Sequence, residues 1–276
     1  MGVPGLDVEP RQLVPAVVEA FRRNGLINFA AAIAFLMVLA LVPFLLFVLA
    51  LLGFMSLDEV WRDEVAPEIR GSVSQDAYRL LDDTANRVLT EKQGWWVTAG
   101  FGIAVWEVSA AMRVTMTALD RIYGFRRRRG FLELLPRSVA LGLAVGFAVV
   151  AAVAVVRFVP LLTGELDGVL ATVSFLVRWL LAAGLLGVAV ALVVHYGTAT
   201  RQTLPWVSFG TGVVMAAWVA MSILFGVYVT YVASYASVFG HLATFFVLLL
   251  YLYASSIAFL VGVQVDACVR ERAKNG

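Results

Sequence analysis

Long apolar segments alternate with short polar connections along the chain, and this pattern predicts six membrane-spanning helices. Each apolar segment exceeds the roughly 20 residues that a helix needs to cross about 30 Å of hydrocarbon. A lipid-facing backbone must satisfy its own hydrogen bonds, which favours helices, and the short alternating strands of a β-barrel do not occur in the sequence. The predicted spans are Ile27–Phe54, Trp95–Leu119, Leu135–Val159, Val169–Tyr196, Trp206–Val232 and Leu242–Val265. We therefore predict an all-α polytopic membrane protein.

The composition agrees with this pattern and leaves room for one membrane domain. Of the 276 residues, 61% are hydrophobic and 14% are charged, whereas a soluble domain is about half apolar and about a quarter charged. The single cysteine, Cys268, excludes an internal disulfide. We assign residues 1–26 to an interfacial arm with a short amphipathic helix, residues 27–266 to the membrane domain and residues 267–276 to a tail.

The placement of lysine and arginine predicts which side of the membrane each connection faces. Basic residues are enriched in cytoplasmic connections. With six spans, thirteen of the 21 basic residues fall on the side of the two termini, six fall on the other side, and two lie inside spans. We therefore predict that both termini are cytoplasmic and that the connection formed by residues 55–94 faces outward.

This outward connection of residues 55–94 has an amphipathic pattern. Apolar residues recur every four positions from Trp61 to Val73, and the connection holds nine carboxylates. Such a pattern predicts one or two helices lying over the outer face of the bundle. A cap that packs on the bundle is one interpretation, and a segment that gates a substrate is another.

Charged residues inside the predicted spans are the most informative side chains, because each costs at least ~2.5–3.5 kcal/mol at the bilayer centre. Glu107 and Arg178 lie at depths that differ by only about 5 Å, given the helical rise, so we predict that they face the bundle interior and interact, directly or through water. Arg113 lies deeper toward the cytoplasm, where Asp266 or Asp120 could neutralise it. Two interpretations stay open: ion pairs that fix the helix packing, and a polar cavity for a substrate or an ion.

Small residues in three spans predict close helix packing without identifying the contacts. The GxxxG spacing is common in membrane helices and is a weak signal by itself. The candidate glycine pairs are Gly142 with Gly146, Gly184 with Gly187, and Gly210 with Gly212.

The connection after the second span carries a run of four arginines, which we assign to lipid headgroups. These residues are Arg126, Arg127, Arg128 and Arg129. On the predicted cytoplasmic side, anionic lipids attract basic segments of this kind. RNA is the alternative ligand, but we expect no nucleic-acid partner.

Signatures of catalysis and of metal binding do not occur in the chain. There is no P-loop and no HExxH, GxSxG or CxxC motif, and the only histidines are His195 and His241. We therefore expect a protein that is not an enzyme and has no metal or cofactor. The partners we expect are membrane lipids and a lipidic substrate, and the sequence does not predict an oligomeric state.

Four stretches between about Phe29 and Arg272 form a recognisable set. They read AAAIAFLMVLALVPF from Ala30, MRVTMTALDRIYGFRRRRGF from Met112, LPW from Leu204, and FGVYVTYVASYASVFGHLATFFVLLLYLYASSIAFLVGVQVDA from Phe225. Together these stretches resemble the YihY/virulence factor BrkB family of bacterial inner-membrane proteins. Compared with the pattern of that family, Asp120 replaces an asparagine, and Gln264 and Asp266 replace a glutamate and an asparagine. We therefore add Gln264 to Asp120 and Asp266 as candidate intramembrane polar residues.

The resemblance implies a six-span protein of the bacterial inner membrane. Relatives have been linked to serum resistance and to export of lipids or lipopolysaccharide precursors, and the family was once labelled ribonuclease BN. Our leading hypothesis is a protein that transports or handles a lipidic or amphiphilic substrate. The alternatives are a non-transporting scaffold for an envelope complex and, least favoured by the residues, a membrane-bound ribonuclease.

Overall fold

The computed structural model of the chain describes residues 10–55, 59–70, 78–79, 82–83, 85–87, 89, 94–125, 129–163, 169–199, 204–232 and 241–275. The long elements are the helices α1 (Pro10–Arg23), α2 (Leu26–Phe54), α5 (Gly94–Ile122), α6 (Phe131–Thr163), α7 (Val169–Gly197), α8 (Leu204–Val232) and α10 (His241–Asn275). Between α2 and α5 lie a short π-helix, η1 (Val60–Val65), and a short α-helix, α3 (Ala66–Arg70). No strand occurs among the described residues.

Six of these helices are long and apolar enough to cross a membrane, which confirms the predicted all-α fold. They are α2, α5, α6, α7, α8 and α10. Each of these helices begins within a few residues of the start of a predicted span. Helix α2 runs through Pro43 without ending there. Helix α10 continues to Asn275, through the residues that the sequence assigned to a tail.

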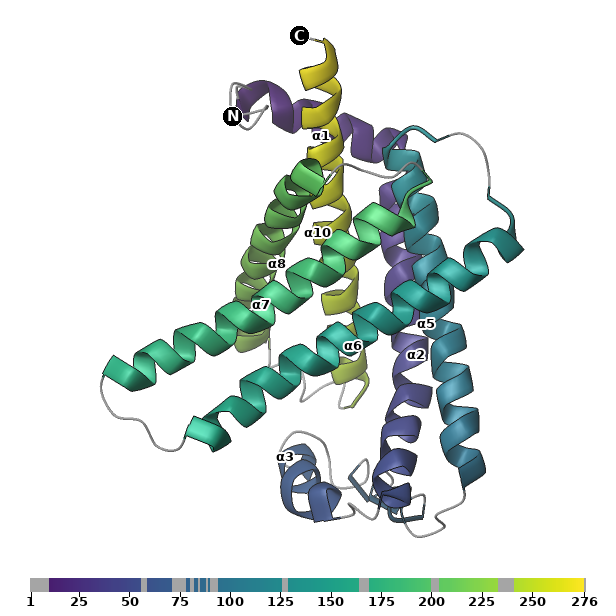
Figure 1. The fold of residues 1–276 in the computed structure, drawn as a ribbon, viewed down its shortest axis with the longest axis vertical. Helices are drawn as coiled ribbons and strands as arrows, with labels where there is room; N and C mark the ends of the chain where they lie inside the picture. Colours follow the sequence, from purple (N-terminus) through teal and green to yellow (C-terminus); the bar gives the residue numbers. More distant parts are fainter. Residues whose placement is uncertain are drawn as a thin grey trace.

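The helices connect two ends of the molecule, which we name after the elements that lie there. Helix α1 and the last turns of α10 lie together at one end, the α1 end, whereas α3 lies at the other, the cap end (Figure 1). At the α1 end, the single cysteine, Cys268, is buried against Val17 and Ala20 of α1. An even number of spans accounts for the two termini lying at one end.

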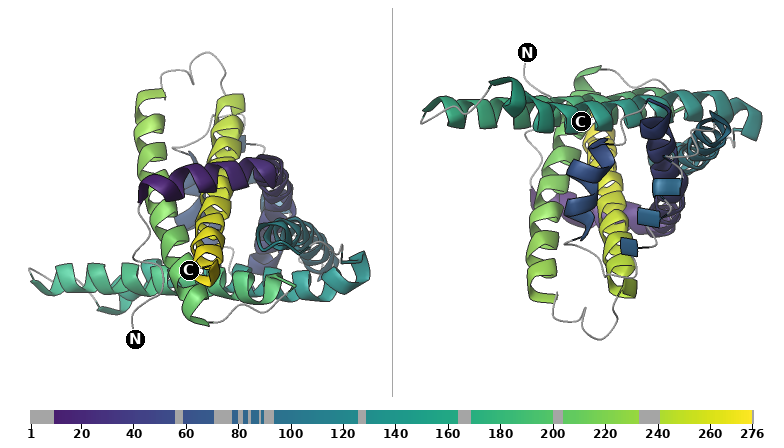
Figure 2. Two further views of the ribbon diagram at one scale, coloured as in Figure 1. Left: turned by 90° about the horizontal axis from the view of Figure 1, so that it is seen from above. Right: turned by 90° about the horizontal axis from the view of Figure 1, so that it is seen from below.

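The six long helices associate in three antiparallel pairs: α2 with α5, α6 with α7, and α8 with α10. Helices α6 and α7 form a layer of their own, and the pair α8 and α10 stands away from that layer at one side (Figure 2). Helices α2 and α5 lie side by side over their whole length (Figure 1). The pairs therefore converge toward the α1 end and separate toward the cap end.

The principal hydrophobic core lies toward the α1 end, where all three pairs meet. Its largest fully buried side chains include Leu26 of α2, Met116 and Leu119 of α5, Val214 of α8 and Leu260 of α10. A smaller cluster lies at the cap end, where Trp61 packs with Ala66, Ala85 and Leu89 against the end of α2. The described part of the connection between α2 and α5 therefore packs on the bundle as a cap.

Candidate functional site

A turn at the end of α5 positions the first polar cluster at the α1 end. Helix α5 stops at Ile122, and Gly124 adopts a left-handed backbone with φ of 74°, which costs glycine little because it has no Cβ. The Phe125 N–H donates to the Asp120 carbonyl at 2.8 Å and closes the turn. Arg129, nine positions after Asp120 in the sequence, lies beside it.

Asp120 and Arg129 form a buried ion pair that joins three segments. Arg129 Nε donates to Asp120 Oδ2 at 2.8 Å, and its Nη2 lies 2.7 Å from the same oxygen. Nη2 donates to the Gly197 carbonyl at the end of α7 at 2.6 Å. The other carboxylate oxygen accepts from the Ala199 N–H at 2.9 Å. The arginine side chain is only 2% exposed. The pair thereby fixes the end of α5 to the end of α7.

A second cluster joins α5 to α10 and α8. Tyr123 Oη donates to Asp266 Oδ2 at 2.9 Å, and the Asp266 carboxyl group lies against the backbone of Gly210 in α8. Burial, followed by the neighbouring Asp266 carboxylate, raises the pKa of the Tyr123 phenol, which keeps it protonated and able to donate. The Arg270 guanidinium lies 5.7 Å from the centre of the Tyr123 ring.

Replacement of Tyr123 by Phe should lower stability by about 1–3 kcal/mol, because it removes the hydroxyl that donates to the buried Asp266 carboxylate. The change keeps the ring and its packing, so the measured loss reports on the hydroxyl. Thermal unfolding in mild detergent measures the effect. The matched control is Tyr196→Phe, since Tyr196 is 48% exposed. Equal midpoints for wild type and Tyr123→Phe would contradict this role for the hydroxyl.

Gln264 forms a third contact at the same end. Its Oε1 accepts from Asn24 Nδ2 at 3.0 Å, and its Nε2 lies 3.5 Å from Cys268 Sγ. Asn24 stands between α1 and α2, so Gln264 ties α10 to the turn between those helices. Gln264, Asp266 and Asp120, three of the sequence candidates, therefore all lie in contacts that close the α1 end.

Arg113 does not form the ion pairs that we expected with Asp266 or Asp120. Its Nη1 donates to Ser109 Oγ at 2.5 Å, and its guanidinium lies 5.5 and 5.0 Å from the ring centres of Trp106 and Phe131. The reason is that Asp120 is held by Arg129, and Asp266 by Tyr123. Ser109 also contacts Ser138 of α6 at 2.8 Å, and both serines are fully buried. Arg113 thus supports the junction of α5 and α6.

Glu107 and Arg178 do not form an ion pair with each other among the described residues. Glu107 is half-buried and is the carboxylate that attracts Arg113. The Arg178 guanidinium lies 5.0 Å from the centre of the Phe175 ring on its own helix. Its Nε is buried and has no hydrogen-bond acceptor in the described part of the chain. Helix α5 contacts α7 only sparsely, which keeps these two positions apart.

The run of four arginines is only partly described. Arg126, Arg127 and Arg128 lie outside the described residues. Arg129 differs from the headgroup contact that we expected, because its side chain turns inward to Asp120. Arg129 forms this internal ion pair rather than a contact with lipid headgroups, because the buried carboxylate at the end of α5 needs a partner.

Burial differs sharply between the two ends of the helices. Toward the α1 end, buried residues recur along α6, α7, α8 and α10. Toward the cap end, no residue is buried in segments 170–181 of α7, 215–228 of α8 and 245–255 of α10, and Ala152 is the one buried residue in segment 143–157 of α6. We call these four segments the open halves. Arg178 lies within the open half of α7, beside Trp179 and Leu180, which are 52% and 70% exposed.

Sequence reasoning missed Tyr123, Asn24 and the serine pair Ser109 and Ser138. Tyr123 stands in the stretch from Met112 that carries the family resemblance, so the motif offered a signal for it. A serine in an apolar helix gives no comparable signal, because its hydroxyl can donate a hydrogen bond to a backbone carbonyl of the same helix. Gly124 after the end of an apolar segment was a further sign of the turn.

Comparison with known proteins gives a family match over nearly the whole chain. The family model described as "Virulence factor BrkB" matches residues 17–276. The chain is also similar to the ribonuclease-like protein YfkH of Bacillus subtilis (strain 168), with 25% identity over 255 residues, which cover 89% of this chain and 90% of that protein. No solved structure matches the chain.

Proposed function

This chain belongs to the virulence factor BrkB family, in agreement with the resemblance of its sequence, and we propose that it accommodates and moves a lipidic, anionic amphiphile. The observation that carries the proposal is the absence of buried residues in the open halves of α7, α8 and α10, within the described residues. Helices packed along their full length bury one face at every turn. Three consecutive turns without a buried residue leave room for acyl chains beside and between the helix pairs.

The open halves are apolar, which suits a lipid rather than a polar solute. Side chains that are about half exposed or more include Phe147 and Val150 of α6, Leu176 and Leu180 of α7, Ile223 and Leu224 of α8, and Phe246 of α10. In a bilayer, such surfaces contact acyl chains at no hydrophobic cost. The open cap-end halves would then admit a lipid from the leaflet at that end.

Arg178 gives the proposed site its preference for an anion. An arginine in an apolar helix needs a counter-charge, because an unpaired guanidinium in hydrocarbon is costly. Its buried Nε has no acceptor among the described residues, and the guanidinium otherwise meets the ring of Phe175. A phosphate or carboxylate of a bound amphiphile would supply the missing acceptor.

We further propose that the protein resides in the bacterial inner membrane with both termini in the cytoplasm. The positive-inside distribution of its lysines and arginines supports this orientation. In this orientation the α1 end faces the cytoplasm, and the open halves lie in the outer leaflet.

Reconstituted protein should accelerate the exchange of fluorescent phosphatidylglycerol between leaflets. Vesicles with a fluorophore-tagged lipid are treated with a membrane-impermeant reductant, and the fraction of quenched lipid is followed over time. Arg178→Gln should slow the exchange of anionic phosphatidylglycerol by roughly tenfold or more, because a hydrogen bond to a charged group contributes about 1.5–3 kcal/mol. The matched control is Arg137→Gln, an exposed arginine near the α1 end of α6, which should exchange lipid like wild type.

If vesicles with the wild-type protein exchange lipid no faster than vesicles without protein, the proposal is rejected.

A second candidate function, the scaffold of an envelope complex, is favoured by the same exposed apolar faces if another membrane protein covers them. That reading predicts no lipid exchange together with a stable complex after mild extraction. The ribonuclease-like name belongs to YfkH, and no described side chain here favours a nuclease proposal.

A further inference from the structure

Helix α1 lies across the bundle at the α1 end instead of running along the spans (Figure 2). It has 14 residues, too few to cross a bilayer, and it leads into α2 through a turn at Asn24 and Gly25. Val17 and Ala20 hold it against α10, where they pack with Cys268. Neither the family match nor the proposed movement of lipid assigns a partner to the rest of its surface.

A second apolar side of α1 is exposed. Val14 and Val18 are 62% and 52% exposed. They share one side of the helix with Phe21, because residues three or four positions apart lie on the same helix face. Phe21 packs against the principal hydrophobic core, which lies among the spans. This side of α1 therefore faces the level of the spans, where the leaflet at the α1 end lies.

The opposite side of α1 is polar. Glu19 and Arg23 are exposed, and they lie four positions apart on the side away from Val14 and Phe21. A helix with one polar and one apolar side lies in the plane of the interface, with its apolar side in the acyl chains. The position of α1 across the ends of the spans fits this arrangement (Figure 1).

Two exposed arginines border the apolar side near the turn between α1 and α2. Arg22 follows Val18 by four positions and lies beside it along the helix. Arg121, in the last turn of α5, has its Nη1 3.4 Å from the Asn24 carbonyl oxygen and its guanidinium 5.0 Å from the centre of the Phe29 ring. Among the described residues, neither arginine has a carboxylate partner. Anionic headgroups attract basic side chains in such positions.

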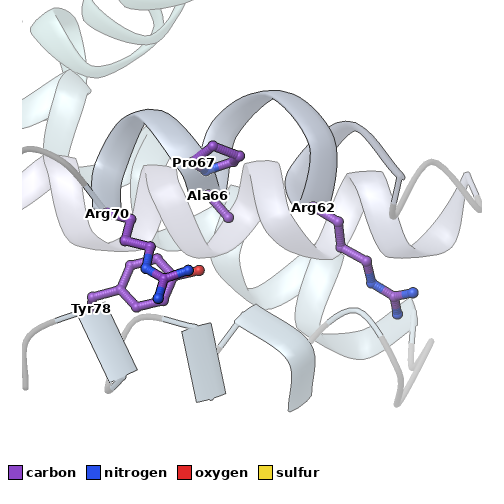
Figure 3. A pocket seen from close by; sticks show the side chains of 5 residues that line it. All are labelled: Arg62, Ala66, Pro67, Arg70 and Tyr78. Carbon is purple, nitrogen blue, oxygen red and sulfur yellow. The ribbon is translucent and has the colours of Figure 1, made fainter. Parts of the chain in front are cut away.

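The arginines of the cap do not form a comparable surface. Around the hollow of the cap, Arg62 extends away from Arg70, which lies against the ring of Tyr78 (Figure 3). The residue after Arg62 is an exposed carboxylate, Asp63. The described part of the cap therefore carries mixed charge, whereas the border of the apolar side of α1 is basic.

We propose that α1 docks on the lipid leaflet at the α1 end, with Val14 and Val18 among the acyl chains and with Arg22 and Arg121 on the phosphates of anionic headgroups. Apolar side chains gain free energy when they leave water, and each basic residue adds its attraction to the anionic surface. Because α1 packs against α10, the docked helix also holds the last turns of α10 at the interface. This docking depends neither on the movement of lipid between leaflets nor on which side of the membrane the α1 end faces.

Spin labels at single cysteines measure the depth of the two sides of α1 in the full chain, reconstituted in vesicles of phosphatidylcholine and phosphatidylglycerol. Val14→Cys, Val18→Cys and, as the matched control on the polar side, Glu19→Cys are made together with Cys268→Ala, so that each protein carries one label. Labels at positions 14 and 18 should collide several-fold more often with oxygen, which dissolves in acyl chains, than with a water-soluble nickel chelate. The label at position 19 should show the reverse.

Two results of this measurement would overturn the docking of α1 on lipid. In one, positions 14 and 18 have the same ratio of collision rates as position 19, so that both sides of the helix lie in water. In the other, positions 14 and 18 are shielded from both reagents, as a protein partner on this side would cause.

The same labels test the preference for anionic headgroups. In vesicles of phosphatidylcholine alone, the label at position 18 should lie closer to water than in vesicles that also contain phosphatidylglycerol. Arg22→Gln and Arg121→Gln should each weaken the effect of phosphatidylglycerol on the equilibrium between docked and undocked α1 by roughly fivefold. The matched control is Arg23→Gln on the polar side, which should respond to phosphatidylglycerol like the unchanged arginines.

Equal depths in the two kinds of vesicle, or an equal loss in Arg23→Gln, would overturn the assignment of Arg22 and Arg121 to anionic headgroups. Because all three arginines are exposed, their replacement should leave folding unchanged, which thermal unfolding of each variant verifies.

Discussion

Asp120→Ala should destabilise the protein by roughly 3–5 kcal/mol, the effect of removing one partner of a buried ion pair. The change leaves Arg129 with a side chain that is 2% exposed and, among the described residues, with only the Gly197 carbonyl as an acceptor. It also removes the acceptor of the Ala199 N–H. In a protein of this size, the midpoint of thermal unfolding shifts by roughly 2–4 °C for each kcal/mol, and scanning fluorimetry in mild detergent measures the shift.

Three further variants separate the charge from the packing. Asp120→Asn keeps an acceptor for the Ala199 N–H but removes the charge, so we expect an intermediate loss. Asp120→Ala combined with Arg129→Ala should cost less than the sum of the two single changes, because the unpaired charge disappears. Glu133→Ala removes an exposed carboxylate and serves as the control. Strict additivity of Asp120→Ala and Arg129→Ala would show that the two side chains are not coupled.

Gly262→Ala should separate α10 from α8 and lower stability by about 1–3 kcal/mol or more, the range for forcing extra volume into a packed contact. A Cβ at Gly262 would lie 2.8 Å from the Val214 Cα and 2.9 Å from the Val214 nitrogen. Backbone atoms cannot move aside as a flexible side chain does, and Val214 is fully buried. The expected result is a lower unfolding midpoint in detergent.

The matched control for Gly262→Ala is Gly212→Ala on the facing helix. A Cβ at Gly212 meets no atom within 4 Å, so the replacement should leave the midpoint unchanged or raise it slightly, since alanine favours the helix. Gly210→Ala should resemble Gly262→Ala, because its Cβ would lie 2.8 Å from Asp266 Cγ. Similar midpoints for the Gly262 and Gly212 variants would mean that α8 and α10 do not pack as closely as described.

The sequence by itself determined the secondary structure and the number of spans. A helix needs a fixed length of apolar residues to cross hydrocarbon, and this requirement is local, so the segments that became α2 and α5 to α8 could be delimited to within a few residues. The amphipathic pattern from Trp61 likewise predicted helices that lie over the bundle, since burial of Trp61 depends on a periodicity that the sequence contains. The stretches that resemble the family were also sufficient to identify it.

Only the tertiary structure decided which charged side chains meet. Sequence position gives the depth of a residue in a span, but the rotation and tilt of each helix determine its neighbours. Glu107 and Arg178 have similar depths, yet the sparse contact between α5 and α7 leaves them without an ion pair. Conversely, Tyr123 and Asp266 are 143 positions apart and lie 2.9 Å from each other, because α5 and α10 converge at the α1 end.

The glycines show the same division. The GxxxG spacing marked Gly142 and Gly146 alike, but a Cβ at Gly142 would lie 2.9 Å from Val108 Cγ1, whereas a Cβ at Gly146 meets no atom within 4 Å. The difference arises because α6 crosses α5 near Gly142 and then diverges from it toward its open half. Where two helices touch depends on their crossing point, which packing over the whole bundle sets and no single segment encodes.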